Sequence, residues 1–425
     1  MIPSVVVSHP ARQGFVYQLP QAAQEAGLPC RFLTGFYYKP GRWPWSLAAA
    51  SPALVRKLSR RSSPALAPES VVAVSGPLPL LLNRLGGYVA GNGAHDRLAA
   101  RWLRRHLPPG AIFHGSIESC LHSLRAAKAK GAMTLLEITL PPWKEAVLAA
   151  EARRLGLPAG PDRPPARLVE EVALADRVMV QSPFVSDFLV EQGVPPGKVV
   201  LLPLGADTGR FRPPAAPPPA TSGLRAIYVG HISMRKGVHL LLEAWRAAAL
   251  PDAELRLVGP VVDDFGLRLL ADLPPGVRHL GVLGQDRLVE QLQGSDLFVF
   301  LSLMEGGPLV VLEALACGLP CLLSLPARSV VREGCEGLLV APGDVAGTAA
   351  ALRRLAADRP GRMGMAEAAR LRAEQFDWSC FRGRLGGFYR GLLERGLEAR
   401  DRPLDLGAQA AGPAAQTPAN GPAAR

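Results

Sequence analysis

The feature that most limits how this 425-residue chain can fold is a regular alternation of short apolar runs with amphipathic stretches of helical period. Met133–Glu137 and Asp296–Leu301 are typical of the apolar runs, and Pro183–Gln192 of the helical stretches. Runs that are apolar throughout and separated by helix-length segments favour parallel strands covered by helices on both faces. The sequence therefore predicts an α/β fold with doubly wound parallel sheets.

A proline-rich segment, residues 203–223, divides the alternation in two. Proline lacks a backbone N–H and fixes φ, so this segment cannot be a helix or a central strand and is expected to be an extended connector. The alternation restarts at Leu224. We expect a first domain over residues 1–206, a linker over 207–223, a second domain over 224–380, and a disordered Ala/Pro/Gly-rich tail over 402–425.

Positive charge is concentrated in the first half of the chain. Residues 1–206 contain 23 Lys and Arg against 13 Asp and Glu, a net of +10, whereas the rest contributes +2 to the total of +12. This excess suggests an acidic partner such as an anionic membrane surface, and a solvated basic surface is the alternative. No nucleic-acid-binding module accompanies the charge, so we expect no nucleic-acid partner.

The cysteines and the N-terminal residues indicate a reducing compartment. Six cysteines are scattered without metal-ligand spacing, and Cys317 and Cys321 are expected to be core thiols. Residues 1–14 carry neither a basic region nor a long apolar run, and no apolar run approaches the roughly 18 residues that span a bilayer. We expect a cytoplasmic protein, with peripheral contact with the inner face of the membrane as an option.

Residues 295–324 contain the first candidate site. An apolar run ends at Ser302, Glu305 follows in a turn, and Gly306-Gly307-Pro308 precedes a helix that carries Glu313. The glycines are expected to let a ligand approach the backbone, while the free N–H groups of the helix start form a cradle for phosphate or hydroxyl groups. Both carboxylates can accept hydrogen bonds from a polyol; a capped helix with a solvated glutamate pair is the alternative.

Residues 224–248 contain the second candidate site. An apolar run leads to Gly230, and Arg235-Lys236-Gly237 begins an amphipathic helix. Two cations at a helix N-terminus oppose the helix dipole, so a bound diphosphate explains them better than local stability does. A surface charge cluster is the alternative. The GxxxxGK[ST] motif is absent, so this is not a P-loop site.

The spacing Gly230…Arg235-Lys236-Gly237…Glu305-x7-Glu313 resembles the retaining glycosyltransferases of family 4 (glycosyl transferases group 1), which have the GT-B fold. The passages 174–213, ACGLPCLL and REGCEGLLVAPGD are also similar to that family. The resemblance implies two Rossmann-like domains facing a cleft. It also implies that a closing helix, residues 381–401, packs back on the first domain.

The resemblance also implies a role for each matching residue. Lys236 and Arg235 would bind the diphosphate of a nucleotide-sugar donor, Glu313 its ribose, and Glu305 the transferred sugar. The backbone of Gly306, Gly307, Pro308 and Leu309 would hold the sugar hydroxyls and the phosphate. Residues near 280–282 would meet the base, and Gly14 would let the first domain approach the phosphates.

Three positions depart from the family pattern. His231 stands where many members have a phosphate-binding arginine, and Gly307 where many have phenylalanine. The strand 133–137 ends in Glu137-Ile-Thr139, where many members present a histidine beside the reacting sugar; Glu137, Thr139 and His114 are the candidates for the acceptor side. For His114, a purely structural role is the alternative.

The resemblance therefore predicts transfer of a sugar from a nucleotide-diphosphate sugar with retention of configuration, without cofactor or obligatory metal. Asp263-Asp264 is a weak counter-candidate for a metal motif. Because the first domain is basic, we expect a cell-envelope glycolipid or polysaccharide as the acceptor. The alternatives are a non-catalytic relative that binds nucleotide sugars and a GT-B nucleotide-sugar epimerase.

Overall fold

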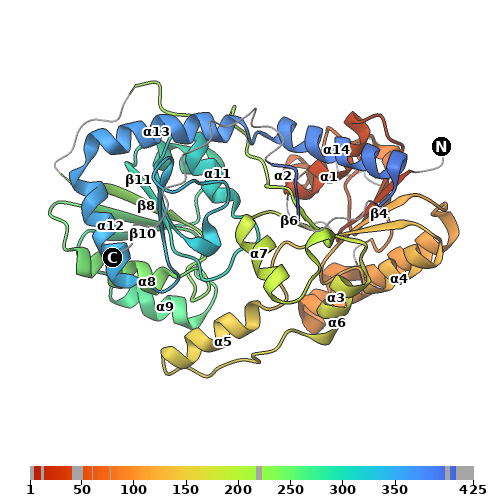
Figure 1. Ribbon diagram of the computed structural model, residues 1–425, viewed down its shortest axis with the longest axis horizontal. Helices are drawn as coiled ribbons and strands as arrows, with labels where there is room; N and C mark the ends of the chain where they lie inside the picture. The colour runs from red at the N-terminus through yellow and green to blue at the C-terminus, as the bar shows by residue number, and fades with distance from the viewer. Residues whose placement is uncertain are drawn as a thin grey trace, which may run out of the picture.

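The computed structural model describes residues 4–10, 14–40, 51–59, 61–76, 78–216, 223–397 and 403–407, with only the backbone for 14, 54, 57 and 78–88. Two parallel sheets form the centres of two halves that lie side by side (Figure 1). Helices cover both faces of each sheet. This α/β architecture confirms the predicted fold class, because the apolar runs became buried parallel strands with helices between them.

The first sheet has the strand order β14-β7-β6-β5-β4-β1-β2-β3. Its strands are β1 (Val5–Ser8), β2 (Cys30–Thr34), β3 (Val71–Ala73), β4 (Ile112–Ser116), β5 (Met133–Glu137), β6 (Arg177–Val180), β7 (Val199–Leu201) and β14 (Leu404–Asp405). Its helices are α1 (Gln18–Glu25), α2 (Pro52–Ser59), α3 (Leu78–His106), α4 (Leu121–Ala129), α5 (Lys144–Arg154), α6 (Ala166–Leu174) and α7 (Pro183–Glu191).

The second sheet has the order β10-β9-β8-β11-β12-β13. Its strands are β8 (Arg225–Val229), β9 (Glu254–Val258), β10 (Val277–Gly281), β11 (Leu297–Phe300), β12 (Cys321–Ser324) and β13 (Gly337–Val340). Its helices are α8 (Val238–Ala248), α9 (Asp264–Ala271), α10 (Gln285–Gln293), α11 (Leu309–Ala316), α12 (Val345–Ala357) and α13 (Arg359–Glu374). In each sheet the strand order reverses beside the first strand, between β1 and β4 and between β8 and β11, where ligands of such folds bind.

The last long helix, α14 (Trp378–Arg395), returns to the first half and packs against α1 (Figure 1). Gly386 permits this close packing, since a Cβ there would lie 2.8 Å from the Ala22 carbonyl oxygen. Arg382 adds ion pairs of 2.8 Å to Glu25. The predicted closing helix is confirmed, although it begins a few residues earlier than the sequence indicated.

The prediction of a disordered tail is wrong for residues 403–407. Leu404 and Asp405 form β14, which pairs in parallel with β7 at the edge of the first sheet. Leu406 is buried, and its N–H donates to the Leu201 carbonyl at 2.9 Å. A short edge strand held by one apolar side chain leaves no periodic pattern in an Ala/Pro/Gly-rich segment. The rest of the tail lies outside the described residues.

Cys30, Cys120, Cys317 and Cys321 are buried and free, as predicted for the latter two. In the described part of the chain, no helix is both long and apolar enough to cross a bilayer.

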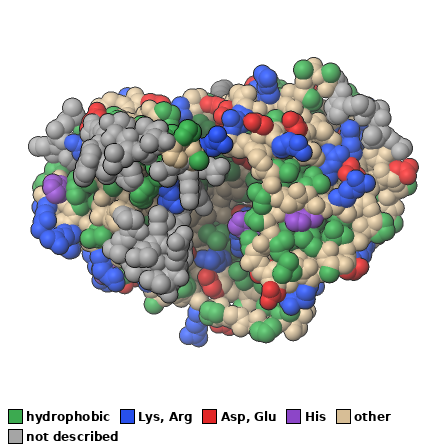
Figure 2. Space-filling view, turned by 180° about the vertical axis from the view of Figure 1, so that it is seen from behind, with side chains coloured by type: hydrophobic (Ala, Val, Ile, Leu, Met, Phe, Trp, Pro, Cys, Tyr) green, Lys and Arg blue, Asp and Glu red, His purple; other side chains and the backbone are tan. Residues whose placement is uncertain are grey.

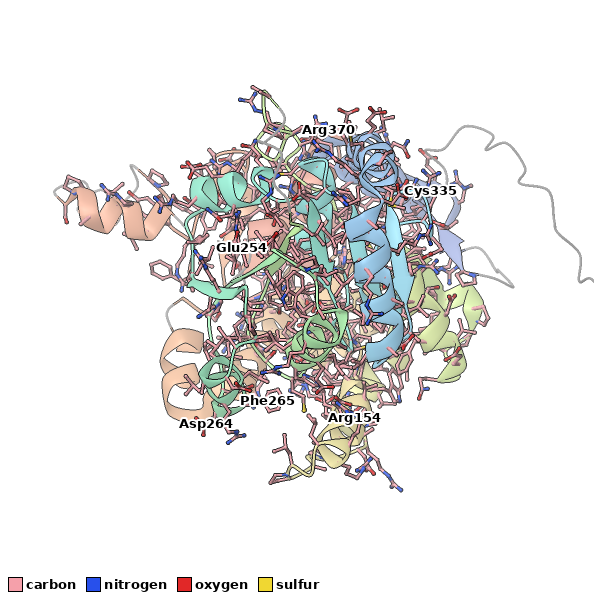
Figure 3. The ribbon with its side chains drawn as sticks, turned by 90° about the vertical axis from the view of Figure 1, so that its left-hand side faces the viewer. Arg154, Glu254, Asp264, Phe265, Cys335 and Arg370 are labelled. Atoms are coloured by element: carbon pink, nitrogen blue, oxygen red, sulfur yellow. The ribbon has the colours of Figure 1, made fainter. Side chains whose placement is uncertain are left out.

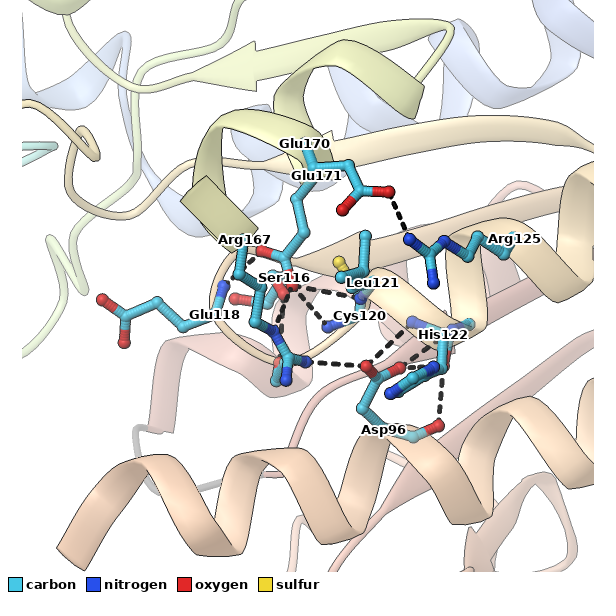
Figure 4. Close-up of polar contacts among 12 residues, drawn as sticks. Asp96, Ser116, Glu118, Cys120, Leu121, His122, Arg125, Arg167, Glu170 and Glu171 are labelled. Atoms are coloured by element: carbon cyan, nitrogen blue, oxygen red, sulfur yellow. Dashed lines mark hydrogen bonds and ion pairs between the residues drawn. The ribbon is translucent and has the colours of Figure 1, made fainter. Parts of the chain in front are cut away.

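Two buried carboxylates hold the loop that follows β4 (Figure 4). Glu171 accepts hydrogen bonds from the backbone N–H groups of Glu118, Cys120 and Leu121, at 2.7, 3.2 and 3.0 Å. Asp96 accepts from the backbone N–H groups of His122 and Ser123, both at 2.9 Å. Together they satisfy the free N–H groups at the start of α4. They also fix Glu118 in a left-handed conformation, φ +72°, that residues other than glycine rarely adopt.

Replacing Glu171 is therefore expected to destabilise the fold. Glu171→Ala leaves three buried N–H groups without an acceptor, and we expect a loss of about 3 kcal/mol in the free energy of unfolding, measured by urea denaturation. The neighbouring Glu170 forms only an exposed ion pair with Arg125, so Glu170→Ala is expected to cost less than about 1 kcal/mol. Equal losses in the two variants would contradict this account of the loop.

Candidate functional site

A cleft of about 770 Å³ lies between the two halves of the molecule. Figure 2 shows the surface hollowed there, with charged side chains at its edge and in its depth. One wall comes from the first half and the other from the loops after β8 and β11. Its lining residues are Phe15, Glu118, Thr139, Leu140, Lys144, Gln181, Leu204, Val229, Gly230, His231, Arg235, Lys236, Glu305, Gly307, Pro308, Leu309 and Val310.

Glu305 is the centre of the wall formed by the second half. Its Oε1 accepts hydrogen bonds from Lys236 Nζ at 2.6 Å, Ser302 Oγ at 2.6 Å and Arg235 Nη1 at 3.0 Å. Arg235 also donates to the Met304 carbonyl at 2.8 Å, and Ser302 to the Arg235 carbonyl at 3.0 Å. The two segments that the sequence singled out are thus joined at one carboxylate oxygen.

The charges at this centre are fixed by their surroundings. Burial raises the pKa of Glu305, but the charges of Lys236 and Arg235 outweigh it and bring that pKa below its ordinary value. Burial lowers the pKa of Lys236, and the Glu305 carboxylate partly restores it. The ammonium also lies 4.9 Å from the centre of the Phe300 ring. With one carboxylate and two cations, the centre has a net positive charge toward the cleft.

Glycine is required where α8 begins. Gly237 has φ +65°, and a Cβ there would lie 1.9 Å from the Leu301 carbonyl oxygen. The start of α8 therefore lies directly against the end of β11. This contact explains why a Lys-Gly pair brings Lys236 within reach of a glutamate 69 residues later.

Gly306 and Gly307 make a contact between the two halves that the sequence did not reveal. A Cβ on Gly306 would lie 1.8 Å from the Thr139 carbonyl oxygen, and a Cβ on Gly307 would lie 2.5 Å from Gln181 Cβ. The backbone that approaches these glycines is that of the first half of the chain, so they let the two walls of the cleft meet. Their contact with a donor sugar stays a prediction.

The remaining residues predicted in the second half lie around this turn. Pro308 is the N-cap residue of α11 and Leu309 its first residue, and both line the cleft. Glu313, one turn further along α11, is partly buried and is not among the cleft residues. Burial, with no opposing cation, raises its pKa to about 7.

His231 also lines the cleft, and its side chain is exposed. Its backbone carbonyl accepts from the Tyr228 hydroxyl at 2.7 Å. Burial, Lys236 and Arg235 lower the pKa of its imidazole, in that order of size.

The candidates in the first half separate into two groups. Thr139 lines the cleft, and Gly14 begins the short 3-10 turn that contains the cleft residue Phe15. His114 and Glu137 are instead fully buried behind the wall. His114 Nδ1 shares a 2.6 Å hydrogen bond with the Tyr389 hydroxyl of α14, which supports the structural alternative for this histidine.

Glu137 acts on the cleft through a neighbour. Its Oε1 accepts from Gln181 Nε2 at 3.1 Å, and burial raises its pKa to about 7. Gln181 itself lines the cleft and touches Gly307. Glu137 thus holds the amide of a side chain whose Cβ and Cγ lie beside Gly307.

Sequence reasoning missed Glu118, Lys144 and Gln181. Lys144 Nζ lies 3.3 Å from Glu118 Oε1, and the two form an ion pair on the first wall. No motif marks these residues, because β4, β5 and β6 bring their loops together only in the folded sheet. Each lies beyond the carboxyl end of a strand, where ligands of parallel sheets bind.

Within the residues that the structure describes, no three His, Cys, Asp or Glu side chains are grouped as a metal ion would require. Asp263, half of the weak metal candidate, caps α9 by accepting from the Gly266 N–H at 2.8 Å. That the sugar transfer requires no metal ion stays a prediction. A second cavity of about 310 Å³ lies at the amino ends of β8 and β11, where Arg225 and Asp296 form an ion pair.

The chain is similar to known proteins in sequence and in fold. Residues 223–358 match the model of the family glycosyl transferases group 1. The matched segment contains Arg235, Lys236, Glu305 and Glu313. The whole fold is that of GT-B glycosyltransferases, as the solved structures similar to it show.

Two relatives define the sequence similarity. The D-inositol 3-phosphate glycosyltransferase of Geodermatophilus obscurus is 31% identical over 284 residues, 60% of this chain and 62% of that protein. The sulfoquinovosyl transferase SQD2 of Arabidopsis thaliana is 33% identical over 159 residues, 36% of this chain and 30% of that protein. The chain thus spans just over three-fifths of the first relative and under a third of the second.

Two solved structures define the similarity in fold. Sucrose-phosphate synthase from Thermosynechococcus elongatus superposes with a TM-score of 0.67 at 22% identity, covering 92% of this chain and 99% of that one. Anabaena Alr3699/HepE, solved in complex with UDP and glucose, superposes with a TM-score of 0.61 at 15% identity, covering 91% and 99%.

Gly306 offers a direct test of the contact between the walls. Gly306→Ala places a Cβ against the Thr139 carbonyl, so we expect the halves to separate and the radius of gyration in X-ray scattering to increase. Gly284→Ala adds the same methyl group in open space and serves as the control. An unchanged radius in a folded Gly306→Ala variant would show that the walls are not in contact in solution.

Proposed function

We propose that this protein is a glycosyltransferase that moves a sugar from a nucleotide-diphosphate sugar to an acceptor. The observation that carries the proposal is the pair Arg235 and Lys236, oriented by one buried carboxylate toward a cleft at the point where the strand order reverses. The family match over residues 223–358 supports it. UDP and glucose bound to Anabaena Alr3699/HepE, a protein of the same fold, favour a uridine diphosphate donor.

In this proposal the donor lies along the second wall. Arg235 and Lys236 neutralise the diphosphate, and Glu313 accepts hydrogen bonds from the ribose hydroxyls. Glu305 and the N–H groups that follow it hold the transferred sugar. The base lies near Leu280–Val282, where Val282 is exposed.

The chemistry follows from this placement. An acceptor hydroxyl forms a bond to the anomeric carbon while the bond from that carbon to the diphosphate oxygen breaks. The cations stabilise the charge that develops on the leaving diphosphate. A phosphate oxygen of the leaving group takes the acceptor proton, so neither a protein base nor a metal is required. Retention of configuration is part of this proposal.

We place the acceptor against the first wall, beside Thr139, Glu118 and Lys144. A carboxylate next to an ammonium can hold the hydroxyls and any acidic group of an acceptor. The net charge of +10 over residues 1–206 fits a cell-envelope glycolipid or polysaccharide and peripheral contact with an anionic membrane at the cytoplasmic face.

Substitutions at the centre separate binding from turnover. Lys236→Ala is expected to weaken UDP binding by about 1.5–3 kcal/mol, the range for a charged hydrogen bond, measured by calorimetry.

Glu305→Gln is expected to keep UDP affinity within a few-fold and to lower turnover of the cognate UDP-sugar by about 100-fold or more. Wild-type turnover in Glu305→Gln would remove that carboxylate from the site. A product that is an isomeric nucleotide sugar, rather than free UDP, would favour the epimerase alternative.

The raised pKa of Glu313 predicts pH-dependent donor binding. Because its carboxyl titrates near 7, the carboxylate that accepts from ribose is fully formed only above that pH. UDP affinity is therefore expected to rise between pH 6 and 8 with release of a proton, measured by calorimetry in buffers of different ionisation enthalpy. Glu313→Gln is expected to remove the proton release assigned to this group. The same proton release in that variant would place the titrating group elsewhere.

A further inference from the structure

A buried polar contact joins the two halves near the C-terminal end of α5. His239, on the first turn of α8, donates from Nε2 to Glu151 Oε1 of α5 at 2.6 Å. Their exposed fractions are only 3% and 9%. Phe265 of α9 packs edge-on against the imidazole, with 5.3 Å between ring centres. Figure 1 shows α5 below the two sheets, and Figure 3 shows Arg154 and Phe265 at that same end of the molecule.

α5 connects this contact to the cleft. Lys144, its first residue, lines the cleft, and Glu151 lies two turns further along the same helix. On the other side, His239 follows Lys236 by three residues, and Gly237 fixes the start of α8 against β11. A shift of α5 against α8 would therefore change the distance between Lys144 and Lys236. The pair therefore joins the two halves that carry the walls, although neither residue lines the cleft.

The charges around the pair suit a contact that forms and breaks. Burial raises the pKa of Glu151, but hydrogen bonds from Arg154 and His239 outweigh it, so Glu151 is ionised. Burial lowers the pKa of His239 more than Glu151 and Glu243 raise it, so the imidazole is neutral and donates one hydrogen bond. Its Nδ1 is buried and has no hydrogen-bond partner among the residues that the structure describes. Opening the halves would hydrate both groups, whereas breaking the pair in the closed state would leave a buried carboxylate short of a donor.

We propose that Glu151 and His239 are positioning residues that hold the cleft closed. They thereby set the distance between the first wall, where the acceptor is placed, and the cations of the second wall. The proposal deepens the proposed glycosyl transfer and rests on it for its effect on turnover. The structural part of the proposal, that this pair holds the two halves of the molecule together, does not depend on that function.

The test compares variants that remove the bond with variants that keep it. Glu151→Ala and His239→Phe, which keeps the packing against Phe265, are each expected to increase the radius of gyration in X-ray scattering. They are expected to lower kcat by about 10- to 100-fold, as displacements of about 1 Å do, with UDP affinity unchanged. Glu151→Gln retains an acceptor for His239 and is expected to restore most of both properties. Arg153→Met changes an exposed cation of the same helix, leaves the hydrogen bonds of Glu151 in place, and is the matched control, expected to keep the wild-type radius and kcat.

The double variant distinguishes positioning from simple damage. Glu151→Ala/His239→Phe is expected to be no slower than the slower single variant, because both substitutions remove the same bond, whereas independent lesions would add. A kcat within twofold of wild type together with an unchanged radius would overturn the proposal, and so would additive losses or a parallel loss of UDP affinity. If the wild-type protein transfers no sugar, the proposed function fails and the scattering comparison alone decides whether the pair closes the cleft.

Discussion

The architecture of the site depends on one carboxylate oxygen. Glu305 Oε1 accepts hydrogen bonds from Ser302, Arg235 and Lys236, and thereby ties the loop after β11 to the start of α8. The two partly buried cations would repel each other without it, and the buried carboxylate would be unstable without them. The arrangement leaves an oriented positive charge facing the cleft before any ligand arrives, which is the condition for electrostatic stabilisation of a leaving group.

The strand order of each sheet reverses at one point, and the cleft lies where these two points face each other. Loops after β4, β5 and β6 form one wall, and loops after β8 and β11 form the other. Gly306 and Gly307 let the walls meet at the Glu305 turn. The hydrogen bond between His239 and Glu151 joins the halves again near the C-terminal end of α5. The same geometry that orients the cations therefore determines how close an acceptor on the first wall can come to a donor on the second.

The sequence predicted those parts of the molecule that local patterns determine. The alternation of buried strands and helices gave the α/β class, and the spacing of Lys236 and Glu305 marked two segments that the fold brings together. Glu118, Lys144 and Gln181 escaped notice because sheet pairing alone makes them neighbours. The contact of Gly306 and Gly307 with the first half was not predicted for the same reason: sequence shows that a backbone needs room, but not that another part of the chain lies against it. β14 was missed because two residues on a sheet edge carry no periodic signal.

The central claim is that the cleft binds a nucleoside diphosphate through Arg235 and Lys236. Calorimetric titration of the wild-type protein with UDP, GDP, ADP, UMP and uridine tests it most directly. We expect one diphosphate, with UDP favoured, to bind clearly more tightly than its own monophosphate and nucleoside, because only the diphosphate engages both cations. A folded protein that binds none of the diphosphates, or that binds uridine as tightly as UDP, would show that Arg235 and Lys236 do not form a diphosphate site.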